Sequence, residues 1–289
     1  MSRKLALIGF GEAGRTFATA GNWGGDAGAY DLLVTQGAMR DAMVEAGVTP
    51  CADLAGALDG APLVLSLVTA DQAPLAALAA AGAIAPGALY CDMNSVAPQT
   101  KQASAQAIEA AGAHYVDVAV MAPVDPARLS VPLLLAGAKA AEAGALLEAL
   151  GFTNIRIVGD AVGRASSIKM IRSVMVKGME ALTAECALAA QEAGVLDEVL
   201  SSLDASERPR PWAERADYNL DRMMIHGERR AAEMEEVVKT LEGLGTGAMM
   251  TRGTVQRQRA IGQLGLKQPE TGLTHKIEHI SRKGGMQTA

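Results

Sequence analysis

The chain has 289 residues, of which 49% are hydrophobic, 20% are charged and only 3% are aromatic. This composition predicts a packed globular core of aliphatic side chains rather than a disordered chain. The length is enough for one large domain or two modest ones. The net charge is −6, and Lys and Arg interleave with Asp and Glu toward the C-terminus, so no nucleic-acid partner is predicted.

The spacing of the cysteines and the length of the apolar runs predict where in the cell the protein is located. The three cysteines are far apart in the sequence: Cys51, Cys91 and Cys186. This spacing indicates reduced thiols rather than a disulfide framework or a metal site. The first apolar run, Leu5–Phe10, is too short for a signal peptide, and Pro86 and glycines interrupt the Ala-rich stretch Leu75–Leu89. The sequence therefore predicts a soluble, cytoplasmic protein with no membrane partner.

Short apolar runs recur through the first half of the chain, and segments of helical character separate them. The predicted strands are Leu5–Phe10, Gly28–Asp31, Leu63–Val68, Ala88–Met93, Tyr115–Val120, Leu133–Ala136 and Ile155–Val158. Ala73–Ala81 and Thr100–Ala111 are two of the predicted helices. This alternation predicts an α/β fold of the Rossmann type, with a doubly wound, mainly parallel sheet and helices on both faces.

The alternation of strands and helices stops near Gly159. The predicted helices beyond it are Ala165–Ala193, Trp212–Ile225, Glu228–Leu241 and Met249–Leu264. The first of these is unusually long, and a proline-containing loop at Ser206–Pro211 follows it. We therefore expect a Rossmann domain over residues 1–160 and an all-helical domain over residues 161–289.

The loop after the first predicted strand has the pattern G-x-G-x-x-G and leads into a helix. Glycines in this pattern allow a tight turn, close approach of a pyrophosphate to the backbone, and close packing of helix on strand. The N–H groups at the start of the helix then bind the phosphates. We predict that a nicotinamide cofactor is held by Gly9, Phe10, Gly11, Glu12, Ala13 and Gly14.

An acidic residue ends the second predicted strand, Gly28–Asp31. The Asp31 carboxylate can accept hydrogen bonds from the adenosine ribose hydroxyls, and it would repel a 2′-phosphate. This favours NAD as the cofactor and leaves NADP possible. We also expect Val68 and Thr69, at the end of the run Leu63–Val68, to contact the cofactor.

Three further segments combine with the glycine loop into a family pattern. They are Asp92–Pro98 and Asp117–Pro123, which each follow a predicted strand, and Gly163–Lys169, which opens the long helix. In order and spacing the chain resembles the β-hydroxyacid dehydrogenases, the family of 3-hydroxyisobutyrate dehydrogenase, tartronate semialdehyde reductase and 6-phosphogluconate dehydrogenase. The resemblance covers about residues 3–200, and the remainder looks like a divergent branch with its own C-terminal helical domain.

The resemblance implies that Lys169 is the general acid/base. Removal of a hydride from an alcohol carbon needs a base for the hydroxyl proton, and the reverse reaction needs an acid. A lysine in a dry cleft can serve, because desolvation lowers its pKa. Lys169, Ser173, Lys177 and Glu180 also form a polar stripe along the predicted helix, which is alternatively a solvated face.

The residues expected to contact the substrate are partly typical of the family and partly not. The resemblance places Asn94 and Ser95 near the substrate carboxylate. The family's Ser-Gly-Gly is replaced by Met121, Ala122 and Pro123, and Pro123 has no N–H to offer. Arg172 and Ser173 stand where the family has Asn, and Arg172 could hold an acidic group. His226, on a later helix, is a further candidate, with surface or packing roles as the alternative.

The predicted function is an NAD(P)-dependent oxidoreductase that moves a hydride between a hydroxy acid and the cofactor. Its substrate is expected to be a small acid. An imine reductase-like enzyme is one alternative, against which Lys169 argues, and a non-catalytic nucleotide-binding sensor is another. No metal is expected. Because the helical half is strongly apolar and the family packs long helices between subunits, we also expect a homodimer or higher homo-oligomer.

Overall fold

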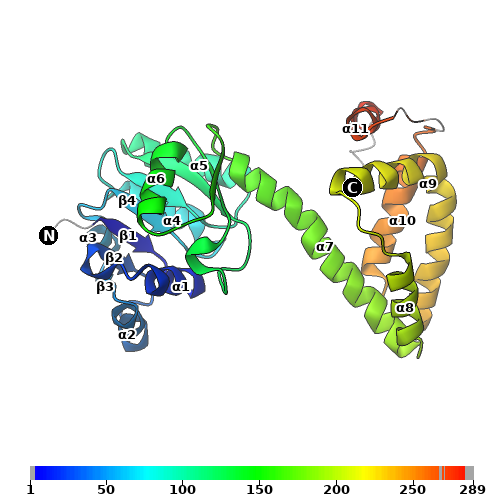
Figure 1. Ribbon diagram of the computed structural model, residues 1–289, viewed down its shortest axis with the longest axis horizontal. Helices are drawn as coiled ribbons and strands as arrows, with labels where there is room; N and C mark the ends of the chain where they lie inside the picture. The colour runs from blue at the N-terminus through cyan, green and yellow to red at the C-terminus, as the bar shows by residue number, and fades with distance from the viewer. Residues whose placement is uncertain (1–3, 267–268, 270, 284–289) are drawn as a thin grey trace. The chain divides into compact units, whose positions relative to one another are not determined.

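The computed structural model describes residues 4–266, 269 and 271–283. It contains two compact units, Met1–Val174 and Met175–Ala289. The first combines a sheet with helices, and the second contains helices alone among its described residues (Figure 1). The fold therefore matches the predicted order of a Rossmann-type unit followed by an all-helical part.

The first unit is built on one eight-stranded sheet with the order β3-β2-β1-β4-β5-β6-β7-β8. The strands are β1 (Leu5–Ile8), β2 (Ala27–Tyr30), β3 (Thr49–Pro50), β4 (Leu63–Ser66), β5 (Leu89–Asp92), β6 (His114–Val120), β7 (Leu133–Ala136) and β8 (Ile155–Gly159). All neighbouring strands are parallel except β6 and β7, which are antiparallel. Most strands are apolar runs buried along their length, as is typical when helices cover both faces.

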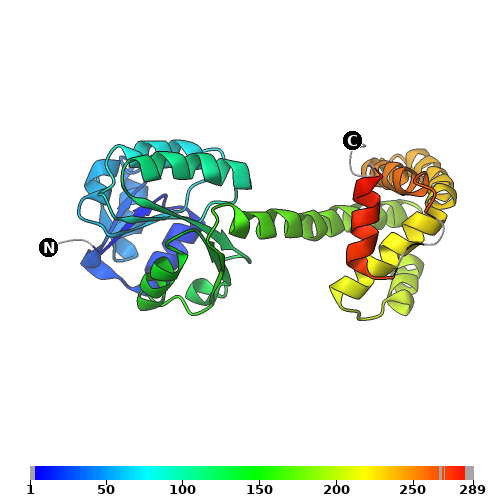
Figure 2. The same cartoon turned by 90° about the horizontal axis from the view of Figure 1, so that it is seen from above.

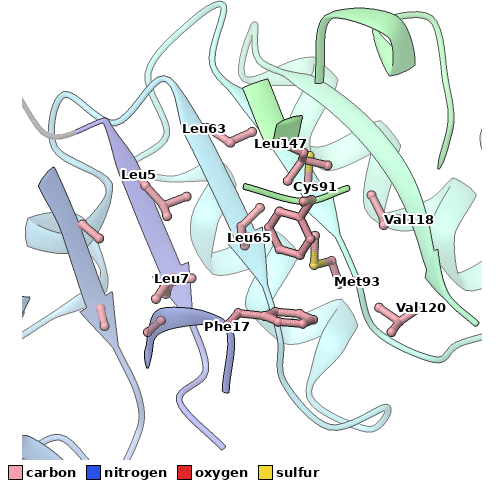
Figure 3. Close-up of a cluster of buried hydrophobic side chains, with 14 of the residues drawn as sticks. Leu5, Leu7, Phe17, Leu63, Leu65, Cys91, Met93, Val118, Val120 and Leu147 are labelled. Atoms are coloured by element: carbon pink, nitrogen blue, oxygen red, sulfur yellow. The ribbon is translucent and has the colours of Figure 1, made fainter. Parts of the chain in front are cut away.

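Helices cover both faces of this sheet (Figure 2). They are α1 (Glu12–Gly21), α2 (Gly37–Glu45), α3 (Leu54–Leu58), α4 (Ala73–Ala81), α5 (Pro98–Ala110) and α6 (Ala140–Ala149), with 3₁₀ turns η1 (Gly24–Asp26) and η2 (Arg128–Ser130). One core cluster joins the sheet to α1, α2 and α6, and a second joins it to α3, α4 and α5. In Figure 3, Leu7 of β1 and Leu65 of β4 project to the side where Phe17 of α1 lies.

The sheet contains a switch point beside its central strand. The strand β1 pairs in parallel with β2 on one side and with β4 on the other, because the chain runs outward to β3 and then returns. Helices that leave β1 and β4 go to opposite faces, which opens a crevice at the carboxyl ends of these strands. Ligands of doubly wound sheets bind in this crevice, so it is the expected position of a functional site.

The long helix α7 (Arg164–Glu192) begins as part of the α/β unit. Ala165 is fully buried in a cluster with Ala119, Leu134 and Ala136 of the sheet. The division into units therefore falls inside α7, after Val174, whereas the sequence pattern suggested a boundary at 160. The reason is packing, since the first turns of α7 bury their apolar side chains against β6 and β7.

The described residues of the second unit form the rest of α7 and four more helices. These are α8 (Leu196–Ser206), α9 (Trp212–Gly243), α10 (Met249–Gly262) and α11 (Leu273–Arg282). The prediction of separate helices at Trp212–Ile225 and Glu228–Leu241 was wrong, because α9 continues unbroken through both. Among the described residues, no helix combines the length and the hydropathy that a membrane span needs.

Gly227 lies inside α9, in the gap between the two predicted helices. A Cβ on Gly227 would lie 2.3 Å from the carbonyl oxygen of Gln258 and 2.8 Å from Cα of Gly262, both in α10. A Cβ on Gly262 would likewise lie 2.4 Å from the backbone nitrogen of Glu228. The two glycines therefore mark where α9 and α10 cross in backbone contact, and Gly227 does not interrupt its helix.

Candidate active site

The glycine loop lies at the carboxyl end of β1, in the crevice. Gly9 has φ +90°, a conformation that favours glycine, and its N–H donates to the carbonyl of Tyr30 at 2.8 Å. A Cβ on Gly9 would lie 2.6 Å from the carbonyl oxygen of Leu67. Gly14 is equally confined, because its Cβ would lie 2.7 Å from the carbonyl oxygen of Gly9. These two glycines let the loop pack between β4 and α1.

Gly11 lies in a more open environment than Gly9 and Gly14. No atom lies within 4 Å of a Cβ built on Gly11, so this position borders open space rather than packed protein. Gly11 is also the N-cap of α1, and no side chain caps this helix end. A pyrophosphate needs this combination of free N–H groups and absent side chain. The loop Gly9–Gly14 therefore fits a dinucleotide.

Asp31 lies immediately after β2 and faces the same loop. Its Oδ2 accepts the N–H of Phe10 at 2.8 Å, and its Oδ1 accepts the N–H of Leu33 at 2.9 Å. Each carboxylate oxygen can accept a further hydrogen bond. The structure thus places Asp31 beside the glycine loop, in the position from which a ribose hydroxyl could be bound.

A pocket of about 520 Å³ opens at the carboxyl ends of the central strands. Its lining residues all belong to the α/β unit: Glu12, Ala13, Leu67, Val68, Thr69, Ala70, Met93, Asn94, Ser95, Val120, Ala122, Pro123, Val124 and Lys169. Of the predicted site residues it brings together cofactor candidates (Glu12, Ala13, Val68, Thr69) and substrate candidates (Asn94, Ser95, Ala122, Pro123) around Lys169. Its polar side chains come from α1, from the segments after β4 and β5, and from α7, and apolar side chains line the rest.

Lys169 and Ser95 form the closest polar pair in this pocket. The ammonium Nζ of Lys169 donates to Oγ of Ser95 at 2.5 Å. Ser95 follows β5 and is exposed, while Lys169 lies on the second turn of α7 and is half-buried. Residues far apart in the sequence thus place a proton donor and a hydroxyl side by side at the mouth of the crevice.

Three hydrogen bonds hold Asn94 in place. Its Oδ1 accepts the N–H of Val68 at 2.7 Å, and its Nδ2 donates to Oγ of Ser66 at 2.9 Å. Its own backbone N–H donates to Oδ1 of Asp92 at 2.9 Å. These bonds tie the loop after β5 to the loop after β4. Only one side-chain N–H of Asn94 is left for a ligand, so this residue mainly holds Val68 and Ser95 in place.

The segment after β6 contributes only in part. Ala122 and Pro123 line the pocket, whereas Met121 packs with the apolar cluster under α7. Nη1 of Arg172 lies 3.5 Å from the carbonyl oxygen of Met121, and Arg172 borders a neighbouring hollow rather than the pocket. Ser173 donates its hydroxyl to the carbonyl of Lys169 within the helix.

Other candidate groups lie elsewhere. His226 is on α9, in the helical unit, and the pocket is lined by the α/β unit alone. Complete burial raises the pKa of the Cys91 thiol to about 12, so this thiol stays protonated at neutral pH. Among the described residues, no group of three or more His, Cys, Asp or Glu is placed to hold a metal ion.

The pocket also contains residues that sequence reasoning missed. Its apolar wall is made by Leu67, Ala70, Met93, Val120 and Val124. Each lies within a few residues of the carboxyl end of a strand, and this position in the sequence could have indicated that it lines the pocket. Three charged residues, Asp92, Asp117 and Lys101, are fully buried under the pocket. The sequence does not reveal their burial, because Asp and Lys side chains are ordinarily exposed.

Residues 4–159 match the family model described as the NAD binding domain of 6-phosphogluconate dehydrogenase. The chain belongs to this family. Its α/β unit is therefore an NAD(P)-binding domain, in agreement with the open glycine loop and with Asp31. Residues 190–261 match a second model, described as a domain of unknown function (DUF1932). The divergent C-terminal branch predicted from the sequence is thus a recognised helical domain.

Three relatives share 29–38% sequence identity with this chain. A conserved hypothetical protein from Sinorhizobium meliloti is 38% identical, with 98% of this chain and 97% of that chain covered and a TM-score of 0.61. A conserved protein described as structurally similar to 3-hydroxyacid dehydrogenases is 29% identical, with coverages of 90% and 99% and a TM-score of 0.58. An uncharacterised 28.5 kDa protein of Methanothermus fervidus is 29% identical over 52% of this chain, and the match covers 57% of that protein.

More distant structures share the fold. An imine reductase from a Pseudomonas species is 16% identical, with a TM-score of 0.71 over 97% of this chain and 100% of that chain. A reductive aminase from Aspergillus terreus, solved with NADPH, is 18% identical, with a TM-score of 0.73 and the same coverages. At this identity the likeness shows the fold alone.

Proposed function

We propose that the protein is an NAD-dependent dehydrogenase that interconverts a small hydroxy acid and its aldehyde or ketone. The observation that carries this proposal is the contact between Lys169 Nζ and Ser95 Oγ, beside an open dinucleotide loop. A cation that is fixed at a crevice for a hydride carrier supplies the proton transfer that oxidation of an alcohol requires. Hydride transfer and proton transfer would then take place in the same pocket.

The residues divide the chemistry as follows. A bound nicotinamide ring would accept a hydride from the carbinol carbon and return it in the reverse reaction. In the reduction, Lys169 as the ammonium donates its proton to the carbonyl oxygen while the hydride reaches the carbon. In the oxidation, Lys169 as the neutral amine takes the proton of the hydroxyl group. Ser95 holds Nζ in position through its hydroxyl group.

The cofactor would lie along the carboxyl ends of β1 and β4. Gly11 and the start of α1 would receive the pyrophosphate, and Asp31 would receive the ribose hydroxyls. The carboxylate of Asp31 favours NAD over NADP, because a 2′-phosphate would meet its negative charge. Val68 and Thr69 would contact the nicotinamide half, since they line the same pocket as Lys169.

A carboxylate on the substrate is favoured by the charge of Lys169 and by the remaining side-chain N–H of Asn94. The loop after β6 offers less, because Pro123 has no backbone N–H. The apolar wall around Met93 and Val120 suits the carbon skeleton of a small acid. We therefore propose an acid whose charged end lies near Asn94 and Lys169 and whose apolar end faces this wall.

The test is a dehydrogenase screen of the purified protein with NAD and NADP against aldonic, 3-hydroxy and aromatic hydroxy acids. With a responsive substrate, Lys169→Ala is expected to lower kcat by about 100-fold or more, the usual contribution of a general acid/base. Lys177→Ala is the matched control, because Lys177 is an exposed lysine about two turns later on the same helix. Unchanged turnover by Lys169→Ala would disprove the proposed mechanism.

Imine reduction is a second candidate, favoured by the Ala122-Pro123 segment, which leaves a carboxylate fewer donors than a Ser-Gly-Gly loop. The same screen decides between the two when cyclic imines and NADPH are included. Turnover of imines with no response to any hydroxy acid would favour the reductase. Tight NADH binding by fluorescence without turnover of either class would favour a nucleotide-binding sensor.

We also propose that the chain assembles as a homodimer or a higher homo-oligomer through α7. Ile171 and Val174 are each 71% exposed, and Leu188 is 63% exposed. Large apolar side chains repeated along one helix cost free energy in water unless another surface covers them. A second copy of the same helix, with the same apolar side chains, is a suitable cover.

A further inference from the structure

Three charged side chains are completely buried under the candidate site. Lys101 lies on α5, Asp92 ends β5 and Asp117 lies in the middle of β6, and each has 0% relative exposure. Nζ of Lys101 is 2.9 Å from Oδ1 of Asp92 and 3.5 Å from Oδ1 of Asp117, and it donates to the carbonyl of Asp92 at 2.5 Å. Burial of three charged groups costs free energy, and proteins with apolar residues in place of such a triad are often equally stable. Stability alone therefore does not explain why this triad is present.

The first carboxylate holds the loop that bears Ser95. Oδ1 of Asp92 accepts the backbone N–H of Asn94, the residue just before Ser95, at 2.9 Å. Oδ2 of Asp92 accepts the hydroxyl of Tyr115 at 2.5 Å. Burial, and next the charge of Asp92, raise the pKa of the Tyr115 hydroxyl, so it remains a donor. The position of Ser95 therefore depends on the position of the Asp92 carboxylate.

The second carboxylate holds the helix that bears Lys169. Oδ2 of Asp117 accepts the backbone N–H groups of Gly163 and Ser166, at 3.1 and 3.0 Å, and the Ser166 hydroxyl at 3.1 Å. These bonds satisfy donors at the first turn of α7. Lys169 lies one turn beyond Ser166 on the same helix. The position of Lys169 therefore depends on the position of the Asp117 carboxylate.

We infer that Lys101 is a positioning residue that sets the geometry between Lys169 and Ser95. Its ammonium contacts the two carboxylates whose other contacts hold the two segments in place. Without this cation, two buried carboxylates would lie close together unbalanced, and they would move apart or one would take up a proton. Either change displaces the backbone groups that they bind. The inference rests on the proposed function, because it takes Lys169 and Ser95 to act in catalysis. Displacements of about 1 Å in such a site can lower a rate about 100-fold.

The kinetic test is a double-mutant cycle between Lys101→Met and Lys169→Ala. Lys101→Met is expected to lower kcat at least about tenfold and to leave the Kd for NADH within about twofold, because the glycine loop is untouched. In the Lys169→Ala background the same change should alter kcat by less than about twofold. Lys101→Arg, which keeps the charge, should recover part of the rate, and Lys139→Met at an exposed lysine is the control. Equal losses in both backgrounds would overturn the inference.

A second readout does not depend on turnover. The rate at which an amine-acylating reagent labels Lys169 is measured by mass spectrometry as a function of pH. Lys101→Met is expected to shift the midpoint for Lys169 and to leave that of Lys139 unchanged. Because this measurement needs no substrate, it separates the inference from the proposed function, whose own failure would appear as unchanged turnover by Lys169→Ala.

A further variant covers the case in which Lys101→Met does not fold. The triple variant Lys101→Met, Asp92→Asn and Asp117→Asn removes all three charges and leaves no unbalanced carboxylate. We expect it to fold, as judged by a cooperative thermal transition, and to show altered labelling of Lys169. Labelling of Lys169 identical to that of the wild type in a folded variant would show that the triad serves stability alone.

Discussion

At the scale of single residues, Asp31 is the residue that we propose sets the choice between NAD and NADP. Its carboxylate lies against the glycine loop through the N–H of Phe10, where the adenosine ribose would bind. Asp31→Asn removes the negative charge that opposes a 2′-phosphate. We expect the preference for NAD over NADP to fall by roughly tenfold, equivalent to about 1.4 kcal/mol of binding free energy.

The Kd values for NADH and NADPH, from fluorescence titration, measure this preference directly. Asp41→Asn is the matched control, since Asp41 is an exposed carboxylate on the neighbouring helix α2. An unchanged ratio of the two Kd values in Asp31→Asn would show that Asp31 only holds the loop. A rise in both Kd values by the same factor would support the same conclusion.

At the scale of elements, the crossing of α9 and α10 depends on two glycines. In Gly227→Ala the added Cβ would overlap backbone atoms of α10, which cannot rotate away, so the helices must separate. This steric cost outweighs the better helix propensity of alanine. We expect the free energy of unfolding to fall by about 1–3 kcal/mol.

The control for this substitution lies in α10 itself. Nothing is within 4 Å of a Cβ on Gly253, so Gly253→Ala should raise the free energy of unfolding by up to about 1 kcal/mol. Urea denaturation followed by circular dichroism measures both variants. Equal effects in the two variants would contradict the close crossing.

A second prediction at this scale concerns the cap of α10. The carboxylate of Glu185 accepts the backbone N–H groups of Met250 and Thr251 and the hydroxyl of Thr251. Partial burial acts to raise the pKa of Glu185, but these hydrogen bonds outweigh it, and the pKa is lower than the ordinary 4.5. A carboxyl group whose pKa is lower in the folded state stabilises the fold above its unfolded pKa, and this contribution disappears as the pH falls through the folded pKa.

The stability difference between wild type and Glu185→Gln should therefore be full at pH 7 and shrink as the pH falls below about 4.5. Hydrogen exchange of the first turn of α10 is the local measurement, and urea unfolding is the global one. Glu180→Gln, an exposed glutamate on the same helix, is the control. A difference that does not depend on pH would show that the carboxylate charge is not the stabilising feature.

At the scale of the whole molecule, the exposed apolar side chains of α7 predict self-association. Light scattering is expected to give at least twice the chain mass of 29.8 kDa. Val174→Glu should shift the protein toward the monomer, because a buried interface would then contain an unpaired charge. Lys139→Glu, at an exposed lysine outside α7, is the control and should leave the mass unchanged. A monomeric wild type would contradict the proposal.

The sequence predicted the α/β unit more completely than the helical unit. Each apolar run proved to be a strand, because strands of a parallel sheet are buried on both faces and appear as continuous apolar segments. The strand β3 (Thr49–Pro50) was missed because two residues give no pattern. The helices α8 and α11 were missed because short amphipathic segments gain their helical structure mainly from tertiary packing. The division of α9 into two predicted helices was wrong, because the sequence does not show that Gly227 lies at a helix crossing.

The candidate site was predicted unevenly, for a related reason. The sequence predicted that the glycine loop and Asp31 lie together, because their positions follow from local backbone requirements such as the positive φ of Gly9. Ala122 and Pro123 line the pocket, whereas Arg172 borders a neighbouring hollow. The direction of a side chain on α7 depends on how the helix packs on β6 and β7, and the spacing of residues does not contain that information.

The sequence by itself determined the features that local chemistry dictates, namely the dinucleotide loop, the alternation of strands and helices, and the all-helical second half. Only the tertiary structure decided that Lys169 donates to Ser95 and that Lys101 lies between Asp92 and Asp117 under them. These contacts join residues on separate strands and helices. A glycine loop can be recognised because neighbouring residues set its shape, whereas a buried ammonium acquires its role only when the sheet and two helices surround it.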